Sequence, residues 1–421
     1  MKISFLGAAG EVGRSAILVS DKQKILLDYG IKINPDSKGK GIELPHKTVP
    51  DFVFISHAHL DHIGAVPYLI KYGYKGLFYS SELTFQLGRI MLEDSAKIAH
   101  EEGYPARFGK ADIQKTLERR FAMNYDKLVN FGDFSAKLVD AGHIPGSAGI
   151  FMKFNSNKKT LFYTGDVRLT DTKLILGAKK IPKCDILVTE STYGEKEHSD
   201  RNDEERRFAN IVKETVEQGG TVLIPSFALG RAQEMLLILH HHISDKYPVY
   251  LDGMARGTTD VIKKYYSNLR YEDELEEVCK KVRFIKNNEE RKKIVQKPGI
   301  IVTTAGYVQA GPSVFYMREL CLKKESSVLI PGFQVEGSPG RKLQETGKYV
   351  LDEEEITVGM RIEKFDFSAH GDRKELLEIV RRASPEKVFV VHGDKCSEFA
   401  SDIRKDGIDA TAPELGEEFE I

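Results

Sequence analysis

The segment 57–62, HAHLDH, places three imidazoles and one carboxylate within six residues, directly after the apolar run FVFIS. Neutral imidazole and carboxylate are ligands that suit Zn²⁺. From so tight a turn the side chains of His57, His59, Asp61 and His62 point in different directions. One metal ion cannot use all four, whereas two ions can share them. A lone histidine is more often a satisfied surface or core residue, but this density at a strand end favours metal binding.

Other candidate ligands follow further apolar runs. His143 comes after a predicted strand in VDAGHIPG, Asp166 in TLFYTGD and His392 in KVFVVHG. A carboxylate such as that of Asp166 can bind one cation with each oxygen and so bridge two ions. Asp28, in KILLDYG, is expected to hold a ligand imidazole through the N–H that faces away from the metal. Each residue alone is equally well explained by a structural role, but the repeated pattern favours one shared site.

Composition limits the class of protein. The 421 residues are 41% hydrophobic and 30% charged with a net charge of −1, which predicts two or three compact globular units. The balance excludes a uniformly basic surface and leaves room for a local basic cleft. Four cysteines far apart in sequence fit reduced thiols, and neither a signal peptide nor an apolar run long enough for a membrane helix is present. We therefore expect a cytoplasmic protein that does not contact membranes.

The order of predicted elements indicates a split domain. Short strands fill the first 60 residues, 82–128 has mostly helical periodicity, and strands return up to Glu190. From about residue 195, helices and strands alternate, which predicts a parallel α/β layer. The stretch EITVGMRIEKFDFSAHG then again reads as strands. Because the late histidines need partners upstream, we predict one discontinuous domain, 1–192 and 353–421, interrupted by an inserted domain at 193–352.

The motifs HAHLDH, GHIPGS and TGD, in this order, resemble those of the metallo-β-lactamase superfamily. Glu190 in VTESTYG, His370 in FSAHGD and His392 in VVHGD resemble the three further motifs of its β-CASP branch, which processes nucleic acids. The segments 225–234 and 303–313 are similar to parts of that branch's inserted domain. The resemblance covers almost the whole chain. It implies an α/β fold, in which an αββα sandwich with a two-metal site at the sheet edge is interrupted by a parallel α/β β-CASP domain.

The resemblance also implies residue roles and two Zn²⁺ per chain. One ion is expected on His57, His59 and His143, the other on Asp61, His62 and His392, with Asp166 between them and Asp28 in support. Glu190 and His370 match a pair beside the scissile phosphate. We expect His370 to protonate the leaving 3′-oxygen while Glu190 orients it and keeps it cationic, and we count Asp61 with these catalytic residues.

The implied activity is hydrolysis of single-stranded RNA, in processing or decay, by an archaeal homologue of the cleavage-and-polyadenylation endonuclease and RNase J group. Glu190 within ESTYG resembles the polyadenylation type, which favours an endonuclease, and 5′→3′ exonuclease activity stays open. One alternative is a small-molecule metallo-hydrolase acting on a thioester or lactone, but such substrates need no inserted domain. Another is a non-catalytic RNA-binding subunit, but none of the ligand positions has been replaced.

Substrate contacts and partners are less constrained. Arg231 and Arg341 lie near glycine-rich turns, and an arginine fork fits phosphate, although a solvated surface role explains each equally well. Ser147 and Ser338 lie in the turns SAG and GSPGRK, whose backbone N–H groups could bind phosphate. The C-terminal residues end in a short possible strand that could pair with a second copy. We expect a homodimer and, as possible partners, other RNA-processing proteins.

Overall fold

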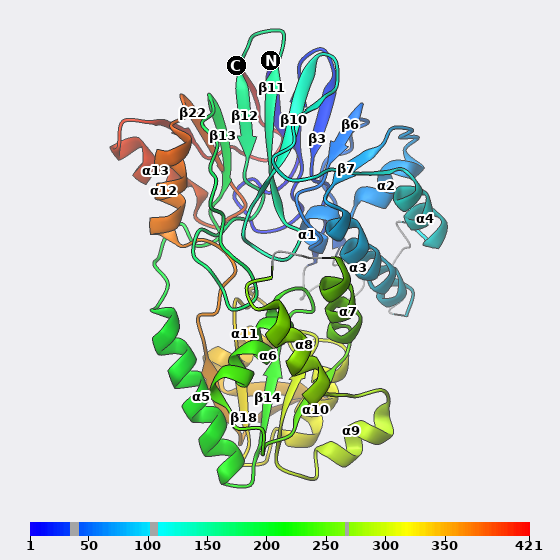
Figure 1. Cartoon of the computed structure of the whole chain (residues 1–421), viewed down its shortest axis with the longest axis vertical. Coiled ribbons are helices and arrows are strands. Elements are labelled where there is room, and N and C mark those ends of the chain that lie inside the picture. The colour runs from blue at the N-terminus through cyan, green and yellow to red at the C-terminus, as the bar shows by residue number, and fades with distance from the viewer. Residues whose placement is uncertain (34–41, 102–107, 266–268) are drawn as a thin grey trace. The chain divides into compact units, whose positions relative to one another are not determined.

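The computed structural model describes residues 1–33, 42–101, 108–265 and 269–421. The chain divides into two compact units (Figure 1). The first unit comprises Met1–Asp171, Leu176–Glu197 and Ala369–Ile421, and the second comprises Thr172–Ile175 and His198–Ser368. The first unit is therefore discontinuous in sequence, and residues from both ends of the chain build it.

Two seven-stranded sheets form the centre of the first unit. The first sheet has the order β24 (Glu418–Glu420), β1 (Lys2–Phe5), β2 (Ile17–Ser20), β3 (Lys24–Leu27), β6 (Phe52–Phe54), β7 (Phe78–Ser80), β8 (Arg120–Ala122). The second has the order β23 (Asp409–Thr411), β22 (Lys387–Val391), β13 (Ile186–Glu190), β12 (Thr160–Tyr163), β11 (Ala148–Phe154), β10 (Phe134–Asp140), β9 (Val129–Asn130). A small hairpin pairs β4 (Lys32–Ile33) with β5 (Ile42–Glu43).

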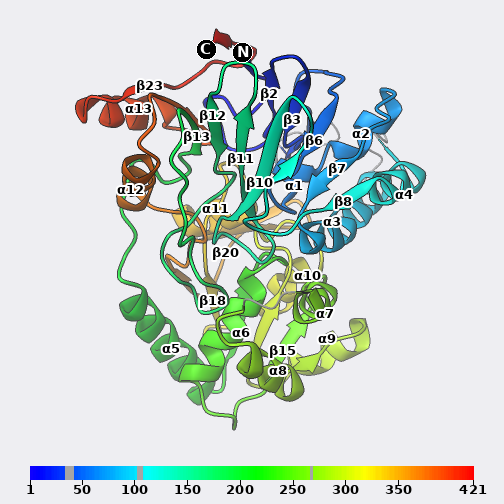
Figure 2. The ribbon, with the colours of Figure 1, turned by 45° about the horizontal axis from the view of Figure 1, so that its top comes forward.

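Helices cover the outer face of each sheet. The first sheet packs on α1 (Leu60–Ile63), α2 (Val66–Lys71), α3 (Glu82–Glu101) and α4 (Lys110–Glu118), and the second on α12 (Arg373–Ala383) and α13 (Cys396–Lys405). Figure 2 shows the strands of both sheets between these two groups of helices. The layers are thus helix, sheet, sheet and helix, because each sheet buries one face against the other sheet and one against helices. The predicted αββα fold is confirmed.

The core between the sheets is rich in aromatic side chains. Phe134 on β10 belongs to this core and is 1% exposed. Its ring lies 5.2 Å from that of Phe52, 6.2 Å from that of Phe54 and 4.9 Å from that of Phe131, measured between centroids. Rings from strands of both sheets therefore join the two layers.

A six-stranded parallel sheet forms the centre of the second unit, as the alternating pattern predicts. Its order is β16 (Arg283–Phe284), β15 (Val249–Asp252), β17 (Gly299–Thr303), β14 (Thr221–Pro225), β18 (Ser327–Ile330), β21 (Arg361–Lys364). The helices are α5 (Arg201–Glu217), α6 (Arg231–His242), α7 (Ala255–Tyr265), α8 (Glu272–Lys281), α9 (Asn288–Ile294), α10 (Pro312–Leu320) and α11 (Pro339–Thr346). A hairpin pairs β19 (Lys348–Leu351) with β20 (Glu354–Thr357).

Three local features differ from the sequence expectations. The chain returns to the first unit at Ala369 and not at residue 353, because β21 pairs with β18 and so completes the sheet of the second unit. The segment after Lys364 is an irregular loop, not the expected strand. The region 82–128 is mostly helical, as expected, but residues Arg120–Ala122 within it form the unexpected strand β8. Whether the three predicted segments fold as domains of their own stays a prediction.

Across the described parts of the chain, no helix combines the length and the apolar character needed to cross a bilayer.

Truncation of the core ring tests the packing between the sheets. Phe134→Ala should lower the free energy of unfolding by about 3–5 kcal/mol, because it removes a buried aromatic ring and leaves a cavity. Phe121→Ala on β8 is the matched control, since that ring is 41% exposed, and it should cost less than about 1 kcal/mol. Guanidinium titration followed by circular dichroism measures both. Equal losses in the two variants would contradict this packing.

Candidate metal centre

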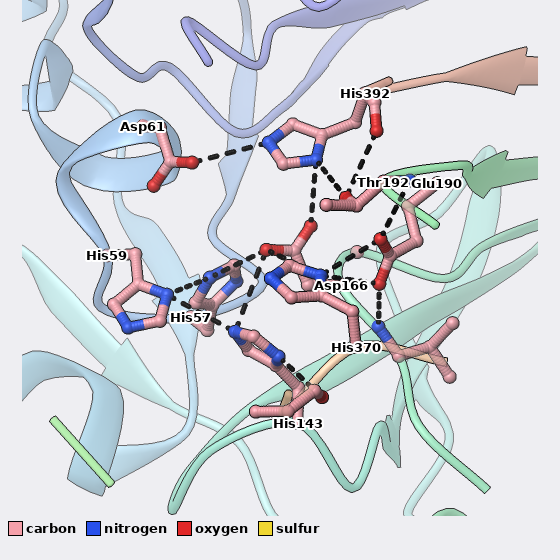
Figure 3. A network of polar contacts seen from close by, with 12 residues as sticks. His57, His59, Asp61, His143, Asp166, Glu190, Thr192, His370 and His392 are labelled. Carbon is pink, nitrogen blue, oxygen red and sulfur yellow. Dashed lines mark hydrogen bonds and ion pairs between the residues drawn. The ribbon is translucent and has the colours of Figure 1, made fainter. Parts of the chain in front are cut away.

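Strand ends bring the predicted ligands together. His57 follows β6, His143 follows β10, Asp166 follows β12 and His392 follows β22. Because β12, β13 and β22 are parallel neighbours, their carboxyl ends meet at one edge of the second sheet. Figure 3 shows the resulting cluster of side chains. All of the predicted ligands belong to the first unit.

Two residues other than glycine have left-handed backbone directly after a strand: Asp28 after β3 and His392 after β22. Asp28 has φ +58° and His392 has φ +51°. Such conformations cost of order 1–3 kcal/mol each and persist only where surrounding contacts fix them. The N–H of His392 donates to the carbonyl of Ala8 over 2.7 Å. The backbone therefore turns sharply at the residues that must face the site.

The first cluster contains His57, His59 and His143 together with Asp166. The Nδ1 atom of His59 lies 3.1 Å from Nε2 of His57 and 3.2 Å from Nε2 of His143. One carboxylate oxygen of Asp166, Oδ2, lies 3.5 Å from His57 Nε2 and 3.6 Å from His143 Nε2. Burial lowers the pKa of His57 and His143 well below the usual value and that of His59 to about 4. The imidazoles are therefore neutral and can offer lone pairs to a cation.

The second cluster contains Asp61, His62 and His392 together with Asp166. The other oxygen of Asp166, Oδ1, lies 3.3 Å from His62 Nε2 and 3.5 Å from His392 Nδ1. The Oδ2 atom of Asp61 lies 3.2 Å from His392 Nε2. Burial lowers the pKa of His62 and His392, but the nearby carboxylates outweigh it and raise both. A cation that binds here displaces these protons.

The donor set fits a divalent cation. Asp166 is buried, and its Oδ1 atom accepts no hydrogen bond from the described residues. A buried carboxylate oxygen without a donor is costly unless a cation satisfies it. The surrounding donors are imidazole nitrogen and carboxylate oxygen, which is the chemistry that zinc prefers in hydrolytic sites.

Asp28 contacts a residue of the second cluster from outside the predicted ligand set. Its Oδ2 atom lies 2.7 Å from Nδ1 of His62 and accepts hydrogen bonds from the hydroxyls of Ser56 and Tyr163 at 2.6 and 2.8 Å. Its Oδ1 accepts the N–H of Ser56 at 2.6 Å. Close to it, Gly30 leaves room for the backbone of Asp61, since a Cβ at Gly30 would lie 1.8 Å from that carbonyl oxygen. The ring of His62 is thus fixed with Nε2 toward Asp166.

Glu190 and His370 form a pair at the side of the clusters. Glu190 is the last residue of β13, and its two carboxylate oxygens lie 3.0 and 2.9 Å from Nδ1 of His370. Burial alone would lower the pKa of His370, but Glu190, Asp166 and Asp61 raise it to about 9. His370 is therefore cationic at neutral pH. These two residues and Asp166 also form a third group with metal-ligand spacing.

Sequence reasoning missed several supporting groups. The hydroxyl of Thr192 lies 3.2 Å from Nδ1 of His392, and that of Ser56 lies 3.0 Å from Nδ1 of His57. The phenol of Tyr163 reaches Asp28. Thr192 and Ser56 are each within two residues of a predicted site residue, so proximity in sequence could have identified them. Nothing in the sequence marks Tyr163, which reaches the site from a central strand.

The four predicted substrate contacts are engaged in contacts within the chain. The hydroxyl of Ser147 accepts the N–H groups of His143 and Ile144, both at 3.2 Å, so it shapes the turn that carries a ligand. In the second unit, buried Arg231 pairs with Glu234, and Ser338 caps α11 by accepting the N–H of Arg341 at 3.2 Å. The side chain of Arg341 pairs with Glu345. Their roles toward a substrate stay predictions.

Family models match most of the chain in three parts. Residues 232–343 match the Beta-Casp domain, and residues 355–413 match the Zn-dependent metallo-hydrolase RNA specificity domain. Residues 1–199 match the model of the anti-Pycsar protein Apyc1.

Curated proteins match the full length. "Probable RNase MJ4" of Methanocaldococcus jannaschii is 40% identical, over 100% of this chain and 100% of that protein. "RNase aCSPSF2" of Saccharolobus solfataricus is 38% identical, over 100% of this chain and 85% of that protein. "Transcription termination factor FttA" of Methanocaldococcus jannaschii is 33% identical, over 96% and 69%.

A solved structure shares the fold. A protein of unknown function from Enterococcus faecalis V583 superposes with a TM-score of 0.62 at 13% identity and covers 99% of each chain. The predicted resemblance is confirmed by the family models and the curated relatives together. The chain belongs to the β-CASP family of metallo-β-lactamase-fold ribonucleases.

Proposed function

We propose that the protein is a two-zinc phosphodiesterase that hydrolyses single-stranded RNA. The observation that supports this most is the placement of Asp166, whose two oxygens face two different clusters of imidazoles. His57, His59 and His143 would hold one ion, and Asp61, His62 and His392 the other. Zinc bound by these residues would activate a water molecule near neutral pH and neutralise charge on the phosphate.

The chain itself supplies the proton for the leaving group. When the bond between phosphorus and the 3′-oxygen breaks, the oxygen keeps the electron pair and takes a proton from His370. Glu190 accepts the Nδ1–H of His370, so the other ring nitrogen is the one that can donate to substrate. The raised pKa of His370 keeps the acid protonated at neutral pH. A catalytic role for Asp61, in addition to metal binding, stays a prediction.

RNA as substrate is supported by the printed names of the relatives and by the RNA specificity domain matched at 355–413. We favour endonucleolytic cleavage because Glu190 lies in ESTYG, and 5′→3′ exonuclease activity at the same site stays open. A small-molecule hydrolase is less well supported, because hydrolysis of a thioester or lactone does not need the domain matched at 232–343. A non-catalytic subunit is less well supported because the predicted ligands converge. A homodimer, other RNA-processing partners and a cytoplasmic location stay predictions.

The substrate test compares two RNAs of one sequence, a linear strand with a 5′-monophosphate and a covalent circle. The zinc-loaded protein should cut both, and a chelator should stop both reactions. An intact circle beside a shortened linear strand would contradict endonucleolytic cleavage and show that the protein is an exonuclease. If neither RNA is cut while zinc is bound, the ribonuclease proposal fails, and rapid turnover of a lactone or thioester would favour the small-molecule hydrolase.

Two histidine substitutions separate acid catalysis from metal binding. His370→Ala should keep both zinc ions and lose about 10²-fold or more in RNA turnover, because only the proton donor is removed. His392→Ala should lose zinc, because it removes a ligand of the second cluster. Metal analysis by plasma mass spectrometry together with single-turnover cleavage distinguishes the two. Complete loss of zinc in His370→Ala would show that this residue is a ligand.

Neutralising Asp28 tests the support of the second cluster. Asp28→Asn should weaken zinc binding about 10–100-fold, because the ring of His62 loses the anionic partner that orients it. Competition with a chromophoric chelator measures the affinity. Asp133→Asn is the control, since Asp133 forms an exposed ion pair with Lys22 at 2.9 Å and should leave zinc binding unchanged. Unchanged affinity in Asp28→Asn would rule out this role.

A further inference from the structure

The loop that carries His370 is fixed through its main chain. This residue lies in the irregular segment between β21 and α12, so no strand or helix orients it. The Nδ1–H of His143 donates to the carbonyl of Ala369 at 2.9 Å. On the other side, Nη1 of Arg168 donates to the carbonyl of His370 itself at 3.0 Å. The position of the acid therefore depends on side chains that come from other strand ends.

The residue before Arg168 holds both members of the acid pair. The N–H of Val167 donates to Oε1 of Glu190 at 2.7 Å. The carbonyl of Val167 accepts the N–H of Gly371 at 2.6 Å. Residues 167 and 168, which directly follow Asp166, thus contact the carboxylate of Glu190. They also contact the loop of His370 at two points, the N–H of Gly371 and the carbonyl of His370.

Arg168 is itself held in place. It is buried, its N–H donates to the carbonyl of Ala141 at 2.9 Å, and its Nε donates to the carbonyl of Thr170 at 3.1 Å. Glu375, in the first turn of α12, accepts the N–H groups of Leu169 and Thr170 at 2.6 and 3.2 Å. A hydrogen bond from a buried guanidinium to a carbonyl is charge-assisted and stronger than one between neutral groups. Its loss leaves a partly buried acceptor without this donor.

We propose that Arg168 is a positioning residue for the cleavage reaction. It holds the main chain of His370 so that the imidazole stays against Glu190 with its second nitrogen available to the leaving oxygen. Arg168 acts through His370, which makes the proton transfer, and Glu375 keeps the segment of Arg168 in shape. This inference rests on the proposed role of His370 as general acid.

Leaving-group dependence tests the role. An alkoxide such as the 3′-oxygen of RNA needs a proton as it leaves, whereas p-nitrophenolate is a weak base and needs none. Arg168→Ala should lower kcat for RNA about 10²-fold with little change in KM, while hydrolysis of bis(p-nitrophenyl) phosphate and zinc content stay within about threefold of wild type. Arg168→Lys should have a kcat for RNA between those of wild type and Arg168→Ala, because an ammonium can reach the carbonyl of Thr170 or that of His370 but not both.

The control is Arg119→Ala. Arg119 is also an arginine of the first unit that donates to a main-chain carbonyl, that of Tyr74 at 2.6 Å, but it lies at the end of α4. This variant should resemble wild type on both substrates. Equal loss on both substrates in Arg168→Ala, loss of zinc, or unchanged RNA cleavage would overturn the proposal.

A spectroscopic readout is independent of turnover. In zinc-loaded protein labelled with ¹⁵N-histidine, the Nδ1 proton held by Glu190 should give a downfield resonance, assigned by its loss in His370→Gln. Arg168→Ala should shift or broaden this resonance, and Arg119→Ala should not. An unchanged resonance would overturn the positioning role. If wild type leaves RNA intact, the proposed function fails, and this resonance still decides whether Arg168 positions His370.

Discussion

The buried carboxylate of Asp166 is the group around which the site of the first unit is arranged. One oxygen faces His57 and His143, and the other faces His62 and His392. A carboxylate in such a buried position is stable only among positive or proton-donating groups. Strands from both sheets end beside it, so the sandwich is required to place ligands that are far apart in sequence. The proposed metal site is thus a consequence of how the two sheets pack.

Two His-Gly-Asp sequences near the C-terminus show how backbone context separates roles. His392 directly follows the buried strand β22, and its ring lies between Asp61 and Asp166. His370 precedes α12 on an irregular loop, is 19% exposed, and turns Nδ1 toward Glu190. The sequences alone suggest equal placement at strand ends. The structure places them differently, which fits a ligand in one case and an acid in the other.

Much of the candidate site could be predicted, because metal ligands cluster at strand ends and their spacing is visible in sequence. The pair of Glu190 and His370 came from the resemblance to the family and not from spacing. Arg168 could not be identified, since its role depends on a main-chain carbonyl 202 residues away. The hydroxyls of Ser147 and Ser338 accept main-chain N–H groups within their own segments, and the role of their turns toward phosphate stays a prediction. Serine side chains in turns and helix caps often make such local hydrogen bonds. A turn sequence alone therefore does not distinguish a structural role from phosphate binding.

We propose that Asp166 joins two metal positions in one chain. Native mass spectrometry of the intact protein during titration with zinc counts the bound ions directly. We predict a final state with two zinc ions per chain, reduced to at most one when Asp166 is replaced by alanine. Saturation of the wild-type chain with a single ion, or two ions retained without Asp166, would contradict the claim.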